Sequence, residues 1–127
     1  VVGSQTTTST PTVLTCDSNG PGTTNQLILA NNSAYYFKGR IIAGVTGGGN
    51  TSAWTFEGAI KRGANAASTS IVGVINTTLV AQDSGASSWT VAFSADTTNG
   101  GLAVTVTGQA STTIRWVAKL ETTEMTF

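Results

Sequence analysis

The stretch from Ala34 to Arg62 constrains the fold most, because it holds two runs in which apolar and polar residues alternate. The glycine-rich segment 46–51 (TGGGNT) lies between the two runs. Alternation with a period of two is typical of a strand with one packed and one solvated face, so the stretch predicts a β-hairpin. The predicted packed face consists of Tyr35, Phe37, Ile41, Ala43, Val45, Trp54, Phe56 and Ile60.

The opposite face of this predicted hairpin is polar and charged. With the turn centred near Gly49, Arg40 is expected opposite Glu57, a cross-strand pair that contributes about 0.2–1 kcal/mol. The simpler interpretation is a solvated sheet face whose charges discourage edge pairing. The alternative is contact with a partner, either a sibling subunit or an acidic glycan, and the candidate subunit contacts are then Tyr36, Lys38, Arg40, Glu57 and Lys61.

The rest of the chain also alternates with the period of strands, and no segment shows a helical stripe. Turn signals rich in Gly, Asn, Asp and Ser separate the runs. The segment 70–82 fits two strands broken near Asn76 or one strand with a bulge at Gly73, and 63–69 favours a loop over one helical turn. Further strands are expected at 11–15, 26–30, 70–82, 89–95, 102–107 and 114–120, the last continuing to the chain end.

About eight strands separated by turn signals predict an all-β fold, an antiparallel β-sandwich that is jelly-roll-like and has no substantial helix. Residues 12–127 are expected to form this single domain, and the Ser/Thr-rich residues 1–11 a linker or N-terminal arm. The large aromatic residues are expected to form its core. They are Phe37, Trp54, Phe56, Trp89, Phe93 and Trp116.

Composition limits the possible functions. Only 9% of the 127 residues are charged, with six of each sign, so binding to nucleic acid by broad phosphate neutralisation is not expected. No apolar run approaches the length of about 18 residues that a membrane-spanning helix needs, so no membrane insertion is expected. A net charge of zero gives little colloidal repulsion between copies. We therefore expect either that the protein is part of an assembly or that its sheet edges are unusually well protected against pairing.

Catalytic signals are lacking. The chain has no His, so no ordinary catalytic triad forms, and no Gly-x-Ser-x-Gly motif occurs; a Ser-Lys dyad remains formally open. Asp17, Asp83 and Asp96 lie in turn clusters, where they are expected to cap backbone rather than bind calcium or act as a hydrolytic pair. The single Cys16 is expected to be a small apolar filler. No catalytic, cofactor-binding or metal-binding residue is therefore expected.

Three blocks of the sequence carry a resemblance to a known group of proteins. They are SAYYFKGRIIAGVTGGGNTSAWTFEGAIKRG, SSWTVAFSADTTNGGLAVTVTG and TTIRWVAKLETTEMTF. These blocks resemble a β-domain at the C-terminal end of tailed-bacteriophage structural proteins of the tail-fibre type, over about Thr12 to Phe127. The resemblance implies a small β-sandwich on a trimeric fibre or appendage, exposed on the virion. It supplies no catalytic residues.

The expected function is that of a non-enzymatic virion structural or adhesin module, a tail-fibre or appendage head that trimerises and binds a host-surface glycan or protein. Loop tips on a rigid scaffold are the usual place for such contacts, and the candidates are Gly48, Asn50, Ser84, Ser87, Thr98 and Asn99. Two alternatives stay open. One is a capsid decoration or assembly module without a receptor. The other is a carbohydrate-binding module of a larger enzyme. Such modules usually expose aromatic residues on which sugars stack, and here only Tyr36 is expected as an exposed large aromatic residue, which counts against this alternative.

Overall fold

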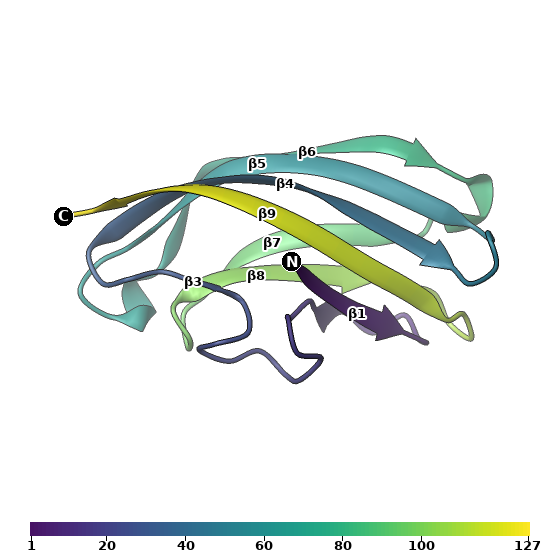
Figure 1. Cartoon of the computed structure of the whole chain (residues 1–127), viewed down its shortest axis with the longest axis horizontal. Helices are drawn as coiled ribbons and strands as arrows, with labels where there is room; N and C mark the ends of the chain where they lie inside the picture. Colours follow the sequence, from purple (N-terminus) through teal and green to yellow (C-terminus); the bar gives the residue numbers. More distant parts are fainter.

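The computed structural model describes all residues 1–127 and consists almost entirely of β-strands (Figure 1). Two single-turn 3-10 helices, η1 (Ala66–Ser68) and η2 (Ser84–Ala86), are the only helical segments. Neither is long and apolar enough to cross a membrane. The strands are β1 (Val2–Thr6), β2 (Thr12–Val13), β3 (Leu27–Ile28), β4 (Ser33–Val45), β5 (Thr51–Arg62), β6 (Ser70–Gln82), β7 (Thr90–Asp96), β8 (Gly101–Thr107) and β9 (Ile114–Thr126).

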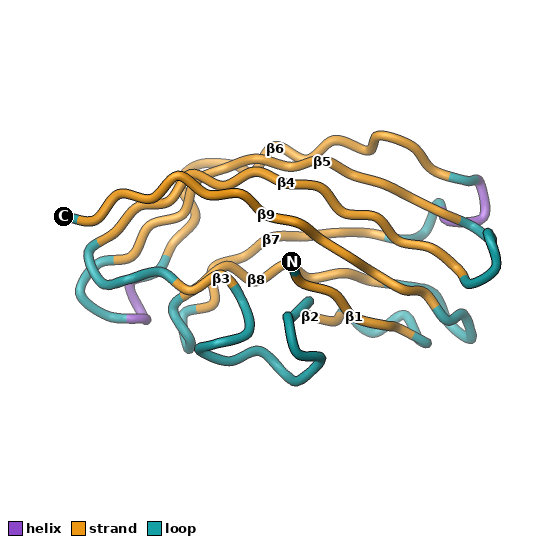
Figure 2. The backbone as a smooth tube through the Cα atoms, in the orientation of Figure 1, coloured by secondary structure: helices purple, strands orange, loops and turns teal.

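The strands form two antiparallel sheets that face each other (Figure 2). The first has five strands in the order β1-β9-β4-β5-β6. In the second, β8 is central, with β7 along one edge and the short β2 and β3 along the other. This arrangement confirms the predicted all-β sandwich. The long strands β4, β5 and β6 follow one another as a meander, and β9 returns from the second sheet to lie between β1 and β4.

The predicted hairpin is β4 and β5, and its alternation places Phe37, Ile41 and Phe56 inside. Its register differs from the expected one. The Val45 backbone N–H donates to the Asn50 carbonyl, so the loop has the four residues 46–49 and is centred between Gly47 and Gly48, not near Gly49. Gly47 and Gly48 both have positive φ (83° and 74°), which glycine adopts without strain. The predicted pairing of Arg40 with Glu57 is therefore wrong. Glu57 lies opposite Lys38, and Arg40 lies opposite Thr55.

The core between the sheets is built around two aromatic clusters. Phe56 packs on Phe93 with ring centroids 4.5 Å apart, and Phe37 lies 6.2 Å from Phe56. In the second cluster, the ring of Trp116 stacks on Trp54 and tilts against Trp89, each at 5.9 Å. All three tryptophans are buried, as predicted from their inward positions.

The N-terminal residues differ from the expected arm. Val2–Thr6 forms β1, which pairs antiparallel with β9 from Val2 opposite Ala118 to Thr6 opposite Ile114. The Thr6 hydroxyl accepts a hydrogen bond from the buried Trp116 indole at 2.9 Å. The polar composition of this segment suits an edge strand because only Val2 and Thr6 are buried. Its Ser/Thr content alone gave no sign of the partner strand.

Two local expectations can also be compared with the structure. Segment 70–82 is one strand with irregular register opposite Gly58, and Gly73 has a φ of 67° there. The bulged single strand is therefore confirmed over two broken ones. Cys16, expected as a small apolar filler, is exposed. The preceding Leu14 and Thr15 are both buried, and the chain leaves the sandwich in a bend at Cys16.

Candidate functional site: the outer face of the five-stranded sheet

The face of the five-stranded sheet that points away from the core, the outer face, is organised in cross-strand rows. Each row takes one residue from β9, β4 and β5, and three of the four rows continue in register onto β6. The apolar row is Val117, Ile42 and Ala53, together with Val80, which lies beside them at an irregularity of β6 where Ala53 pairs with Ala81. The arginine row is Lys119, Arg40, Thr55 and Thr78; the glutamate row is Glu121, Lys38, Glu57 and Asn76; the tyrosine row is Thr123, Tyr36, Ala59 and Val72.

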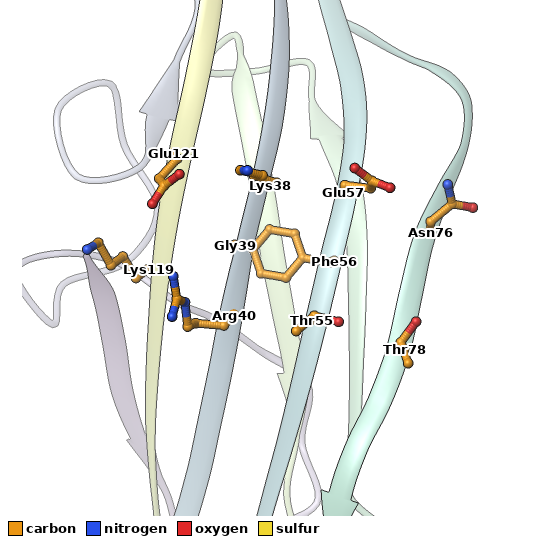
Figure 3. Close-up of a pocket in the computed structure, with 10 residues that line it drawn as sticks. All are labelled: Lys38, Gly39, Arg40, Thr55, Phe56, Glu57, Asn76, Thr78, Lys119 and Glu121. Carbon is orange, nitrogen blue, oxygen red and sulfur yellow. The ribbon is translucent and has the colours of Figure 1, made fainter.

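A hollow of about 320 Å³ lies along the arginine and glutamate rows (Figure 3). All eight residues of these rows line it, together with Gly39 and Phe56. Gly39 carries no side chain, so the ring of the Phe56 opposite it reaches the space between β4 and β5. Lys38 and Arg40 lean toward β9 in this view. The hollow is therefore an open polar depression with a small aromatic floor, rather than an enclosed cleft.

Glu57 accepts a hydrogen bond from the neighbouring tyrosine row. The Tyr36 hydroxyl donates to the Glu57 carboxylate at 2.6 Å. This hydrogen bond, followed by desolvation and the nearby negative charge, raises the pKa of Tyr36. Tyr36 therefore stays protonated and remains a donor to Glu57 at neutral pH.

The apolar row is unusually exposed for its residue types. The exposed fractions are 55% for Ile42, 58% for Val80 and 43% for Val117. These side chains line a second hollow of about 350 Å³ beside Arg40 and Lys119. Contiguous exposed apolar side chains rimmed by charge are typical of interaction surfaces.

Four of the five predicted subunit-contact residues lie together on these rows. Tyr36, Lys38, Arg40 and Glu57 are neighbours on β4 and β5. Lys61 also points outward but lies one row beyond the tyrosine row, opposite Ala34. The predicted outward face of the hairpin is thus confirmed in its geometry, while its role in contacts stays a prediction.

The predicted receptor loops separate into two groups. Gly48 and Asn50 lie next to Ser84 and Ser87, because the Asp83 carboxylate accepts a hydrogen bond from the Thr51 backbone N–H at 2.9 Å. This group is at the end where β4 and β6 finish (Figure 1).

Thr98 and Asn99 lie at the opposite end of the sandwich, in the turn between β7 and β8. The Asn99 amide donates to the Pro21 carbonyl there at 3.4 Å. A single receptor surface therefore cannot include all six predicted loop residues.

The three aspartates predicted to cap turns do so in two ways. Asp17 accepts from the Asn19 N–H at 3.0 Å, and hydrogen bonds led by the Asn25 side chain lower the pKa of Asp17. Burial acts to raise the pKa of Asp96, but hydrogen bonds from Asn99, Gln26 and Thr98 together lower it. Asp83 instead caps the neighbouring loop through Thr51. No group of three or more His, Cys, Asp or Glu side chains that could hold a metal ion is found.

Several residues of the hollow were not among the predicted contacts. Lys119 and Glu121 come from β9, and Asn76 and Thr78 from β6. The alternation of residues 114–121 already placed Lys119 and Glu121 on an outward face. It did not indicate that β9 lies beside β4, since that depends on strand order.

Comparison with known proteins finds no family model, no curated protein and no solved structure that matches this chain. The functional argument therefore depends on the outer face and on the loops at the two ends of the sandwich.

Proposed function

We propose that this chain is a non-enzymatic structural module of a virion, of the tail-fibre or appendage type in tailed bacteriophages. In this proposal it assembles as a homotrimer on the particle surface and binds a host-surface glycan or protein through loops. The resemblance to such phage domains and the low charge of the chain support the proposal.

The observation that carries the proposal is the exposed apolar row beside the positively charged arginine row and the glutamate row, which carries both signs of charge. A protein with six charges of each sign has little net repulsion between copies. Ile42, Val80 and Val117 each expose more than two fifths of their surface in the isolated chain. Association with another surface would remove this apolar area from water, at about 25 cal/mol per Å².

The grouping of the loops refines where a receptor would bind. The 46–50 turn and the segment 83–88 are joined by the bond from Thr51 to Asp83 and expose Gly48, Asn50, Ser84 and Ser87 at one end. This end offers the larger continuous set of predicted contacts. Thr98 and Asn99 lie at the other end of the sandwich and are not part of this surface. The alternative is an assembly module without a receptor.

The proposal is tested by light scattering after gel filtration, followed by binding to an array of bacterial surface glycans and to whole bacterial cells. We expect a mass three times the 12.9 kDa of one chain. We also expect binding that the double change Asn50→Ala with Ser84→Ala weakens by about 5- to 150-fold, since each lost hydrogen bond costs about 0.5–1.5 kcal/mol.

Thr98→Ala, at the opposite end, serves as the matched control and should leave binding unchanged. A chain that stays monomeric at high concentration would contradict the assembly. A stable assembly without binding to any glycan or cell surface would favour the module without a receptor.

A further inference from the structure

We infer that the free edge of β6 pairs antiparallel with the β6 edge of a second copy of this chain, about a two-fold axis at Thr77. The five-stranded sheets of the two copies then form one continuous sheet. The inference goes beyond the proposed function, because it uses the main chain of an edge strand rather than the exposed apolar row. It holds whether or not the chain belongs to a virion.

The strand β6 is a long edge without the usual protection against pairing. It has 13 residues, pairs only with β5, and contains no charged residue and no proline. Edge strands of natural proteins are usually short, or carry charges or prolines that discourage pairing with another chain. Residues 76–81 are all exposed, and Figure 3 shows Asn76 and Thr78 at the margin of the sheet. The outward N–H and C=O groups of β6 are therefore open to a further strand.

The other edges of the sandwich do have such protection. β1 has five residues, and β2 and β3 have two each. β7 has seven residues and ends in the charged Asp96. β9 is covered by β1 only as far as Ala118, and its uncovered part carries Lys119, Glu121 and Glu124. Among these edges, β6 is the one best suited to extend a sheet.

Two irregularities of β6 define the part of the edge that can accept a strand. The register with β5 is irregular opposite Gly58 and again at Val80. Between these two points, Asn76–Leu79 pairs residue by residue with β5. Bulges twist an edge away from a partner. Pairing with a second copy is therefore centred on the regular segment Asn76–Leu79.

Symmetry restricts the register of this pairing. Residues directly opposite one another in an antiparallel pair lie on the same face of the sheet, and side chains alternate along each strand. Opposite residues of two identical strands must therefore be an even number of positions apart in the sequence. The two-fold axis then passes through a residue that lies opposite itself, and not between two residues. Within the regular segment this residue is Asn76, Thr77, Thr78 or Leu79.

Only an axis at Thr77 places like residues opposite each other. Segment 74–80 (VINTTLV) has two apolar residues, three polar residues and two apolar residues, so it is symmetric in residue type about Thr77. An axis at any of the other three residues would place an apolar residue opposite a threonine. The resulting pairs are Thr77 with Thr77, Asn76 with Thr78, Ile75 with Leu79, and Val74 with Val80.

This pairing covers apolar surface that the single chain exposes. The exposed fractions are 84% for Val74, 51% for Leu79 and 58% for Val80. Cross-strand pairs of threonine or of apolar side chains stabilise antiparallel strands. Val80 is the only one of these residues that also belongs to the apolar row. The symmetric pattern and the lack of charge in β6 select a second copy as the occupant, because a two-fold contact brings each surface against itself.

The test is a charge exchange at the axis, with Thr77→Lys and Thr77→Glu, measured by analytical ultracentrifugation. Each variant alone should raise the dissociation constant of the edge contact by about 2- to 30-fold, because a like-charge pair replaces the favourable Thr–Thr pair. An equimolar mixture of the two variants should recover association close to that of the wild type, since a lysine then faces a glutamate. Hydrogen exchange should show protection of residues 74–80 that rises with protein concentration.

Thr123→Lys and Thr123→Glu are the matched controls. Thr123 is an exposed threonine on the uncovered part of β9, which β4 and β5 separate from β6. These changes should leave the association as it is. Recovery on mixing of the two Thr77 variants also excludes misfolding, because two unfolded chains would not restore a folded contact. Loss in both Thr77 variants without recovery on mixing would overturn the axis at Thr77.

Val117→Lys, in the apolar row, separates this inference from the proposed function. It should weaken the proposed trimer and leave the edge contact intact, because Val117 lies on β9. Association that Val117→Lys weakens and the Thr77 variants do not would overturn the edge contact and leave the trimer standing. The reverse result would support the edge contact and contradict a trimer built on the apolar row. A chain that is monomeric at all concentrations would overturn both and leave the β6 edge to a strand of another protein.

Discussion

At the scale of single residues, two glycines decide how the aromatic side chains pack beneath the outer face. Phe56 lies opposite Gly39, and Phe37 lies opposite Gly58. A Cβ at Gly39 would meet the Lys119 backbone carbonyl and would lie 2.8 Å from the Phe56 ring. Backbone atoms of a central strand cannot move aside, so this position admits no side chain. The glycine thus sets both the packing of Phe56 and the depth of the hollow above it.

Gly39→Ala is predicted to destabilise the protein by about 1–3 kcal/mol, the usual cost of inserting a group into a packed site. Gly44→Ala in the same strand is the matched control. A Cβ at Gly44 meets nothing closer than the Thr51 hydroxyl at 3.5 Å, and replacing a strand glycine is otherwise neutral or favourable. Urea unfolding of the two variants measures the difference. Equal effects at both positions would show that the close approach at Gly39 has no energetic consequence.

At the scale of elements, the turn between β4 and β5 determines which charged residues lie opposite each other on the outer face. A turn centred between Gly47 and Gly48 places Lys38 directly opposite Glu57, and Arg40 becomes diagonal to Glu57. Directly opposite Cβ atoms are about 4.5–5.5 Å apart and diagonal ones about 7–8 Å. A shift of the turn by one residue therefore changes every charge pair on the hairpin.

Double-mutant cycles with alanine are predicted to give a coupling of about 0.2–1 kcal/mol between Lys38 and Glu57. The coupling between Arg40 and Glu57 should be smaller, and both should shrink in high salt because exposed charges are screened. Unfolding free energies in urea at low and high ionic strength measure these couplings. A larger coupling for Arg40 than for Lys38 would contradict the register.

At the scale of the whole molecule, the two ends of the chain close the sandwich together. β1 covers the edge of β9, and Thr6 and Trp116, which are 110 residues apart in sequence, share a buried hydrogen bond. The indole of Trp116 also stacks on Trp54 in the core. The first residues of the chain therefore complete the core rather than lead into it.

Thr6→Val is predicted to cost about 1–3 kcal/mol, because it leaves the buried indole N–H of Trp116 without an acceptor. Thr6→Ser keeps the hydroxyl and should cost about 0.8 kcal/mol for the lost methyl group. Thermal or urea unfolding, followed by tryptophan fluorescence, measures both. Equal losses for the two variants would indicate that the methyl group, rather than the hydrogen bond, matters at this position.

Much of the fold could be predicted from the period of the sequence. Alternation in residues 34–62 and 102–107 assigned the strands and the inward face, since side chains of a strand point to alternate sides. The register of the hairpin could not be predicted, because three consecutive glycines allow more than one turn centre. β1 was missed because its Ser and Gln residues show no apolar period, and its pairing with β9 supplies the structure.

Of the candidate site, only the residues on β4 and β5 could be predicted from the sequence. The outward residues of β4 and β5 followed from alternation, which placed Tyr36, Lys38, Arg40 and Glu57 on one face of the hairpin. The position of Lys119 and Glu121 of β9, and of the β6 residues, beside them follows from the folded chain alone. The physical reason is that alternation is a local property of one strand, whereas strand order depends on contacts between distant segments. The cross-strand rows of the outer face exist only once those segments are paired.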